Sequence, residues 1–142
     1  MSRTFLMVKP SAVAAGHTGP IIDALEKGGF RVVGMLMKQL TREEAARFYD
    51  VHVGKGFFET LMEYVTSGPT VGVTLDTEGE DAVASLRAFI GATDPAKAEE
   101  GTIRARFGKS LTANAVHASD SAERVEYESG IYFGECPRAA VG

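Results

Sequence analysis

Short apolar runs alternate with amphipathic stretches along the whole chain. Residues 3–9 and 30–40 are almost continuously apolar, and residues 70–77 form a similar run. Runs of this length that end at Pro, Gly or Thr are typical of buried strands. We therefore predict strands at these three positions, and a short fourth strand at residues 115–118.

Between the strands, apolar side chains recur every three or four positions, which is the spacing of a helix with one buried face. Thr41 followed by Glu44 forms a capping box, and the Ser119-Asp120-Ser121 triplet provides a second helix start. The helices that we predict cover residues 19–28, 41–49, 57–65, 79–90 and, after the triplet, residues up to about 129.

Residues 91–107 show neither pattern and are predicted as one long irregular segment. A loop of this length in a compact domain is usually functional or disordered. The order of the other elements predicts an α/β sandwich with helices packed on one sheet. The pattern leaves open whether the sheet is parallel or mixed.

The composition is that of an ordinary globular chain. Of the 142 residues, 44% are hydrophobic and 24% charged, which predicts a single domain over residues 1–142. The net charge of -4 gives no basic surplus, so we expect neither a nucleic-acid nor a membrane partner. Cys136, as the single cysteine, excludes an internal disulfide and a multi-cysteine zinc site. The first apolar run is too short for a signal peptide, so a cytoplasmic location is expected.

Several well-known motifs are absent from the sequence. It contains no P-loop, no Rossmann glycine pattern, no HExxH and no GxSxG. The three histidines, at positions 17, 52 and 117, have no spacing that indicates a shared metal site. A nucleotide site in this chain would therefore have to be built in another way.

His117 lies in a small, polar segment that suits nucleophilic catalysis. If a backbone carbonyl accepts from Nε2–H, the Nδ1 lone pair is free to attack phosphorus. Taken alone, however, His117 is more simply interpreted as a surface histidine beside a helix cap. Lys9, Arg87 and Arg104 are candidate phosphate ligands, because phosphoryl transfer depends on charge neutralisation. Taken alone, each of them is more often a solvated surface charge, and Phe57 is either a base-stacking or a core residue.

Residues 114–121 (NAVHASDS) resemble the N-x-x-H-G-S-D-S signature of nucleoside diphosphate kinases. Further similarities occur in the family's order along the chain. They are TFLMVKP at 4–10, FF at 57–58, SGP at 67–69, GATDP at 91–95 and GTIR at 101–104. The resemblance implies a ferredoxin-like βαββαβ fold with a four-stranded antiparallel sheet.

The resemblance also implies an activity, which is ping-pong transfer of the γ-phosphoryl group from ATP or another nucleoside triphosphate to a nucleoside diphosphate. His117 would carry the phosphoryl group on Nδ1, and the carbonyl of Ala118 would hold Nε2–H. Ser119 and Glu128 would orient the ring as further catalytic residues together with Lys9. Mg²⁺ would travel with the nucleotide, and Asp120 would reach it through water. The residues implied in nucleotide binding are Lys9, Tyr49, Phe57, Leu61, Arg87, Thr93, Arg104 and Asn114.

The chain departs from the family pattern at four places. Ser11 stands where an aspartate is usual, Gly54-Lys55-Gly56 replaces a charged-Arg-Pro run, Ala118 replaces a glycine, and Arg106 replaces a frequent aspartate. None of these changes removes an implied catalytic group, so we expect activity. The family also implies a homo-oligomer, a hexamer or a tetramer. Two alternatives stay open, a non-enzymatic nucleotide-binding regulatory module and an interaction role without nucleotide.

Overall fold

The computed structural model describes residues 1–134. The sequence-based conclusions about Cys136 lie outside these described residues. The elements follow one another in the order β1 (Ser2–Val8), α1 (Pro10–Ala14), α2 (Thr18–Lys27), β2 (Phe30–Lys38), α3 (Arg42–Phe48), η1 (Asp50–His52), α4 (Phe58–Val65), β3 (Thr70–Thr77), α5 (Ala82–Ile90), η2 (Pro95–Lys97), α6 (Ile103–Phe107), β4 (Val116–Ala118) and α7 (Ala122–Phe133). Among residues 1–134, no helix has the length and apolar content needed to cross a bilayer.

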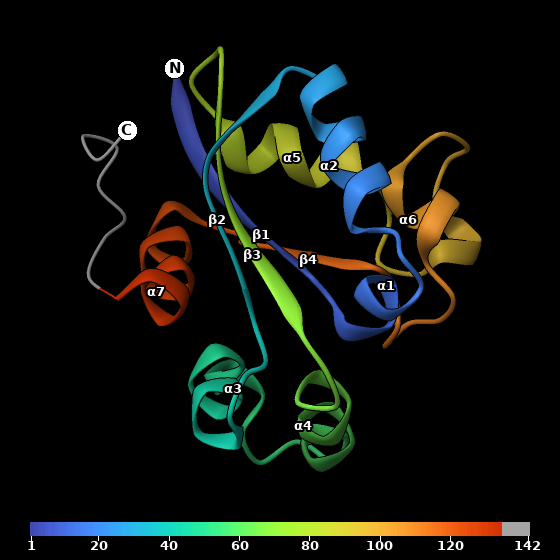
Figure 1. Ribbon diagram of the computed structural model, residues 1–142, viewed down its shortest axis with the longest axis vertical. Helices are drawn as coiled ribbons and strands as arrows, with labels where there is room; N and C mark the ends of the chain where they lie inside the picture. The colour runs from blue at the N-terminus through green and yellow to red at the C-terminus, as the bar shows by residue number, and fades with distance from the viewer. Residues whose placement is uncertain (135–142) are drawn as a thin grey trace.

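The four strands form one sheet in the order β2-β3-β1-β4, and every neighbouring pair is antiparallel (Figure 1). This arrangement confirms the ferredoxin-like prediction and answers the question that the apolar pattern left open. β4 pairs with β1 at the edge of the sheet, where His117 lies opposite Met7. Pairing with the central strand β1 therefore fixes the position of His117 along the sheet edge.

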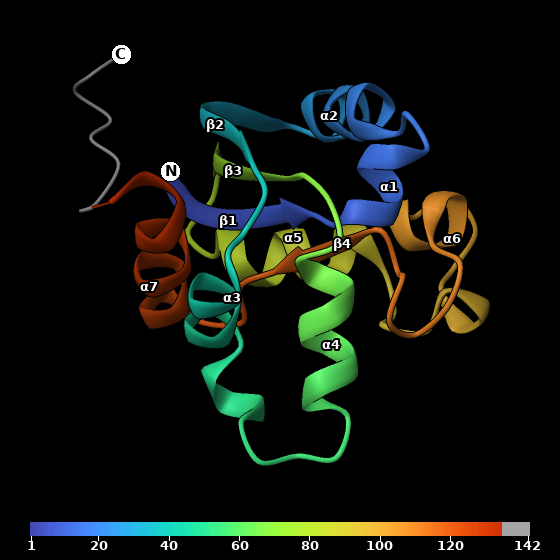
Figure 2. The same ribbon diagram turned by 60° about the horizontal axis from the view of Figure 1, so that its bottom comes forward.

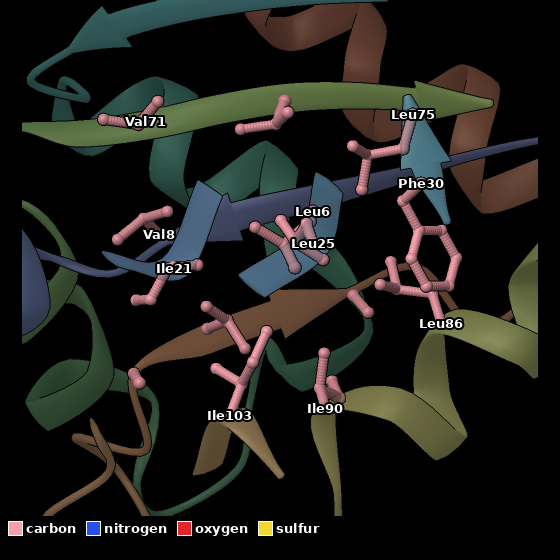
Figure 3. Packing of buried hydrophobic residues seen from close by; sticks show 14 of the residues in the cluster. Leu6, Val8, Ile21, Leu25, Phe30, Val71, Leu75, Leu86, Ile90 and Ile103 are labelled. Atoms are coloured by element: carbon pink, nitrogen blue, oxygen red, sulfur yellow. The ribbon is translucent and has the colours of Figure 1, made fainter. Parts of the chain in front are cut away.

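Helices cover both faces of the sheet, whereas the sequence predicted only that helices pack on it. Leu6 and Val8 point to one face, where they pack with residues of α2, α5 and α6 (Figure 3). Phe5 and Met7 point to the other face, which α3, α4 and α7 cover. Because β1 is buried on both sides, its sequence is continuously apolar instead of alternating.

The segment 91–107 is more regular than the sequence suggested. It contains η2 and α6, whose first turns are capped by Asp94 and Thr102; these side chains accept from the backbone N–H groups of Ala96 and Ala105 at 3.0 and 3.3 Å. The prediction of one irregular segment is therefore wrong. Helices of three to five residues are too short to show an apolar period, so only their caps mark them in the sequence.

Three further elements differ from the prediction. α1 and η1 were not predicted, because each is about one turn long. α7 continues to Phe133 instead of ending near Ser129, and its last turn buries Tyr132 against Phe5 and Phe48. α3 and α4 lie side by side and extend from the sheet, joined by residues 49–57 (Figure 2). This α3–α4 hairpin forms one wall of the candidate site.

Candidate active site

A cavity of about 770 Å³ lies between the α3–α4 hairpin, the exposed face of β4 and the 91–114 segment. It collects side chains from positions that are far apart in the sequence. Of the site residues predicted from the sequence, the cavity is lined by Lys9, Tyr49, Phe57, Leu61, Arg87, Thr93, Arg104, Asn114, His117, Asp120 and Glu128. Ser119 is the exception, because it is fully buried behind the cavity wall.

The His117 ring is held through one nitrogen. Its Nε2 lies 2.8 Å from Oε1 of Glu128, a carboxylate that reaches the ring from α7. The ring also packs edge-on against Phe48, with centroids 5.0 Å apart. Within residues 1–134, Nδ1 has no hydrogen-bond partner, and His117 lines the cavity. An ionised Glu128 makes Nε2 the donor and leaves the lone pair on Nδ1.

The expectation that the Ala118 carbonyl would hold Nε2–H is wrong. That carbonyl accepts instead from Nη1 of Arg87 at 3.2 Å. The Glu128 carboxylate takes its place, and a charged acceptor forms a stronger hydrogen bond than a neutral carbonyl.

Glu128 uses both of its carboxylate oxygens. Ser119 Oγ donates to Oε1 at 2.5 Å, and Arg124 Nε donates to Oε2 at 3.1 Å. Burial alone would raise the pKa of this carboxyl, but the hydrogen bond and charge of His117, followed by Ser119 and Arg124, hold the pKa below its usual value. The carboxylate is therefore ionised at neutral pH and able to accept from the ring.

Lys9 begins a chain of hydrogen bonds at the floor of the cavity. Its Nζ donates to Oδ1 of Asn114 at 2.8 Å and to the carbonyl of Thr112 at 3.2 Å. Asn114 in turn donates to the carbonyl of Thr93 at 2.9 Å. Burial, together with the charge of Arg104, lowers the pKa of Lys9 to about 7. These contacts tie three predicted site residues into one unit.

Arg87 and Arg104 converge on the same cavity from α5 and α6, which the sequence could not show. Arg104 donates to the carbonyls of Gly91 and Val116 at 3.1 and 2.9 Å, and its Nε is buried without a partner within residues 1–134. Burial and the neighbouring Arg87 lower the pKa of Arg104 to about 10, so it stays charged at neutral pH. These two arginines, joined by Lys9 when its amine is protonated, bring positive charge to the cavity.

An aromatic row forms the outer wall of the cavity. The Tyr49 ring stacks on His52 with centroids 6.0 Å apart, and His52 meets Phe57 edge-on at 5.2 Å. Phe57 is half exposed, with Lys55 Nζ 5.9 Å from its ring centroid, so part of the ring is accessible to a planar ligand. Sequence reasoning missed His52 and also Phe48, Leu111, Thr112 and Arg124 on the cavity wall. Arg124 could have been found, since it stands four residues before Glu128 on one helix.

The departures from the family pattern fit the structure. Ala118 has no positive φ, so its methyl group causes no backbone strain there. The strained residue is Ala115, with φ at 78°, where the N–H of Val116 donates to the Asn114 carbonyl at 3.0 Å. Ser11 shares a hydrogen bond of 2.7 Å with the Tyr64 hydroxyl. Arg106 lies over the Phe107 ring at 4.7 Å.

Comparison with known proteins points to one family. The sequence model of nucleoside diphosphate kinase matches residues 2–137. A nucleoside diphosphate kinase of a Nitratiruptor species is 48% identical over 135 residues, covering 95% of this chain and 97% of its own. That of Desulforamulus reducens is 47% identical and covers 94% and 88%. The crystal structure of the Aquifex aeolicus nucleoside diphosphate kinase superimposes with a TM-score of 0.88 at 40% identity, covering 94% of this chain and 95% of that one.

Proposed function

The chain belongs to the nucleoside diphosphate kinase family, and we propose that it transfers phosphoryl groups through Nδ1 of His117. It is an enzyme that moves the γ-phosphoryl group of a nucleoside triphosphate to a nucleoside diphosphate. The observation that carries the role of His117 is the asymmetry of its ring. Nε2 is held by Glu128, while Nδ1 has no partner in the described chain and the ring lines a cationic cavity.

The reaction has two half-steps with the same chemistry. The Nδ1 lone pair of His117 forms a bond to the γ-phosphorus, while the bond from that phosphorus to the bridging oxygen breaks. The electron pair of the broken bond leaves with the nucleoside diphosphate. A second nucleoside diphosphate then reverses the step through its terminal oxygen. Glu128 balances the positive charge that the phosphorylated imidazole carries, because it keeps its contact to Nε2–H.

Lys9, Arg87 and Arg104 supply positive charge where the phosphates must lie. Phosphoryl transfer is mainly a matter of positioning and charge neutralisation, so these cations would account for much of the rate. Asn114 and Thr93 would hold the phosphates and ribose beside Lys9.

The residues present suit a magnesium ion that arrives with the nucleotide. No group of three or more His, Cys, Asp or Glu side chains within residues 1–134 could cage an ion. Asp120 nevertheless lines the cavity beside Arg87, and its carboxylate is able to contact a hydrated Mg²⁺ through water. When bound, the ion neutralises phosphate charge.

The base would stack on Phe57, with Leu61 beside it. Every base has a π-face, so a stacking contact accepts many bases. Broad use of nucleoside triphosphates and diphosphates follows from this arrangement.

A labelling experiment tests the role of His117. The wild-type chain, incubated with γ-labelled ATP and Mg²⁺, should take up label that is stable to base and labile to acid. The label should leave as GTP when GDP is added, and His117→Ala should take up none. Label on His117→Ala would overturn the assignment. A wild-type chain that binds ATP without taking up label would instead support the regulatory-module alternative.

We infer a homo-oligomer, a hexamer or a tetramer, and the exposed apolar edge strand β2 supports self-association. The family match over residues 2–137 supports one domain over residues 1–142. Family membership likewise supports a cytoplasmic location.

A further inference from the structure

We propose that Arg124 is a positioning residue of the reaction, which holds the Glu128 carboxylate in place behind His117. The inference rests on the function proposed above. Arg124 lies on the first turn of α7 and donates from Nε to Oε2 of Glu128 at 3.1 Å. His117 and Ser119 both use the other oxygen, Oε1.

The Arg124 side chain is itself fixed by three further contacts. Nη1 donates to Oδ1 of Asp50 at 3.0 Å, and Nη2 donates to the Phe48 carbonyl at 3.0 Å. The guanidinium also lies 4.5 Å from the centroid of the Tyr127 ring. The planar guanidinium holds its donors in a fixed fork on separate nitrogens, whereas the donors of a lysine all lie on one nitrogen. Arg124 thus joins Glu128 to the end of α3, whose Phe48 ring contacts His117.

The contact matters because Glu128 is almost fully buried. Within residues 1–134, Arg124 is the only partner of Oε2, so its removal would leave that oxygen without a donor. A buried carboxylate that loses a charge-assisted hydrogen bond is protonated more easily. Protonated Glu128 would donate to Nε2, and the ring proton would then occupy Nδ1 and block attack on phosphorus.

Other titratable groups also face this pair. The charge of Glu128 acts on the buried Tyr49 hydroxyl from the end of α3, and His52 on η1 lies within reach of the charges of His117 and Arg124. Asp50 faces Arg124 from η1. Loss of the Arg124 charge also raises the pKa of His52, so the pH profiles are compared in a His52→Gln background, where a change reports on the Arg124–Glu128 contact.

The test measures the single-turnover rate of His117 phosphorylation by γ-labelled ATP and Mg²⁺ from pH 5.5 to 9. In Arg124→Ser the acid limb should move up by about one pH unit, which makes the reaction about tenfold slower on that limb. Arg124→Lys keeps the charge and should restore part of the shift. Asp50→Asn is the matched control: it removes the charge of one partner of Arg124 but leaves Glu128 paired, so its acid limb should coincide with that of the wild type.

Thermal unfolding of each variant separates positioning from a purely structural role. Equal rate losses at all pH values, in proportion to lost stability, would overturn the proposal. An acid limb that moves as far in Asp50→Asn as in Arg124→Ser would also overturn it. If Arg124→Ser fails to fold, Arg124→Lys still decides: an acid limb shifted up by a fraction of a pH unit supports the proposal, and an acid limb at the wild-type position or a loss at every pH contradicts it. A wild-type chain that takes up no label would overturn the proposed function itself, whatever the variants do.

Discussion

At the scale of single residues, Lys9 couples nucleotide binding to the uptake of a proton. Burial and Arg104 lower the pKa of Lys9 to about 7, so at pH 8 the empty cavity holds mainly the neutral amine. Nucleotide phosphates favour the charged form and raise this pKa. Binding of ADP at pH 8 should therefore take up close to one proton, and the affinity for ADP should fall as the pH rises above about 7.

Calorimetry in two buffers of different ionisation enthalpy measures this proton uptake directly. Lys9→Met supplies the control, because methionine has a similar length and no titratable group. Protons that the phosphates of ADP gain or lose occur in both proteins, so the difference between them belongs to Lys9. Equal uptake in the two proteins would show that the protonation of Lys9 does not change when ADP binds.

At the scale of elements, alanine substitutions at two glycines of the α3–α4 hairpin should change the free energy of unfolding in opposite directions. Gly54 has φ at +88°, whereas Gly56 lies outside the left-handed region. A Cβ atom at either position would meet nothing within 4 Å, so only backbone conformation distinguishes them. Gly54→Ala should lower the free energy of unfolding by about 1 kcal/mol. Gly56→Ala should raise it by about 0.5 kcal/mol, because alanine restricts the unfolded chain.

Urea unfolding of the two variants checks this prediction, and each serves as the control for the other. Shifts of the same sign would mean that the hairpin relaxes around the substituted residue. The Gly54-Lys55-Gly56 run is the largest local departure from the family pattern. The pair of variants therefore also tests how much that departure loosens the wall that carries Phe57.

Elements with a long apolar period were predictable, and those without one were not. β3 has the bounds that its sequence predicted, and the capping box of α3 is confirmed by reciprocal bonds between Thr41 and Glu44. α1 and α6 are too short to show a period. The site depends on side chains that meet across elements, such as Arg124 and Asp50, 74 residues apart. The spacing of residues along the sequence does not indicate such contacts. Only the family resemblance could predict that the site residues lie together.

At the scale of the whole molecule, one edge of the sheet is open, because one side of β2 is not paired with another strand of the described chain. β2 pairs with β3 on one side, and within the described chain no strand pairs with its other side. Three consecutive apolar residues of β2, Met35, Leu36 and Met37, are 52%, 40% and 57% exposed. A long apolar edge strand without charges or proline at its centre is a template for pairing with another chain.

If a second copy covers this edge, Met37→Lys should dissociate that contact. A two-fold contact presents the same surface on both copies, so one substitution places two like charges in the interface. Light scattering should then show a smaller assembly than that of the wild type. Val53→Lys is the matched control, because it adds the same charge at a position 62% exposed in the α3–α4 hairpin, away from β2. An unchanged mass for Met37→Lys, or an equal loss in both variants, would place the subunit contact elsewhere on the molecule.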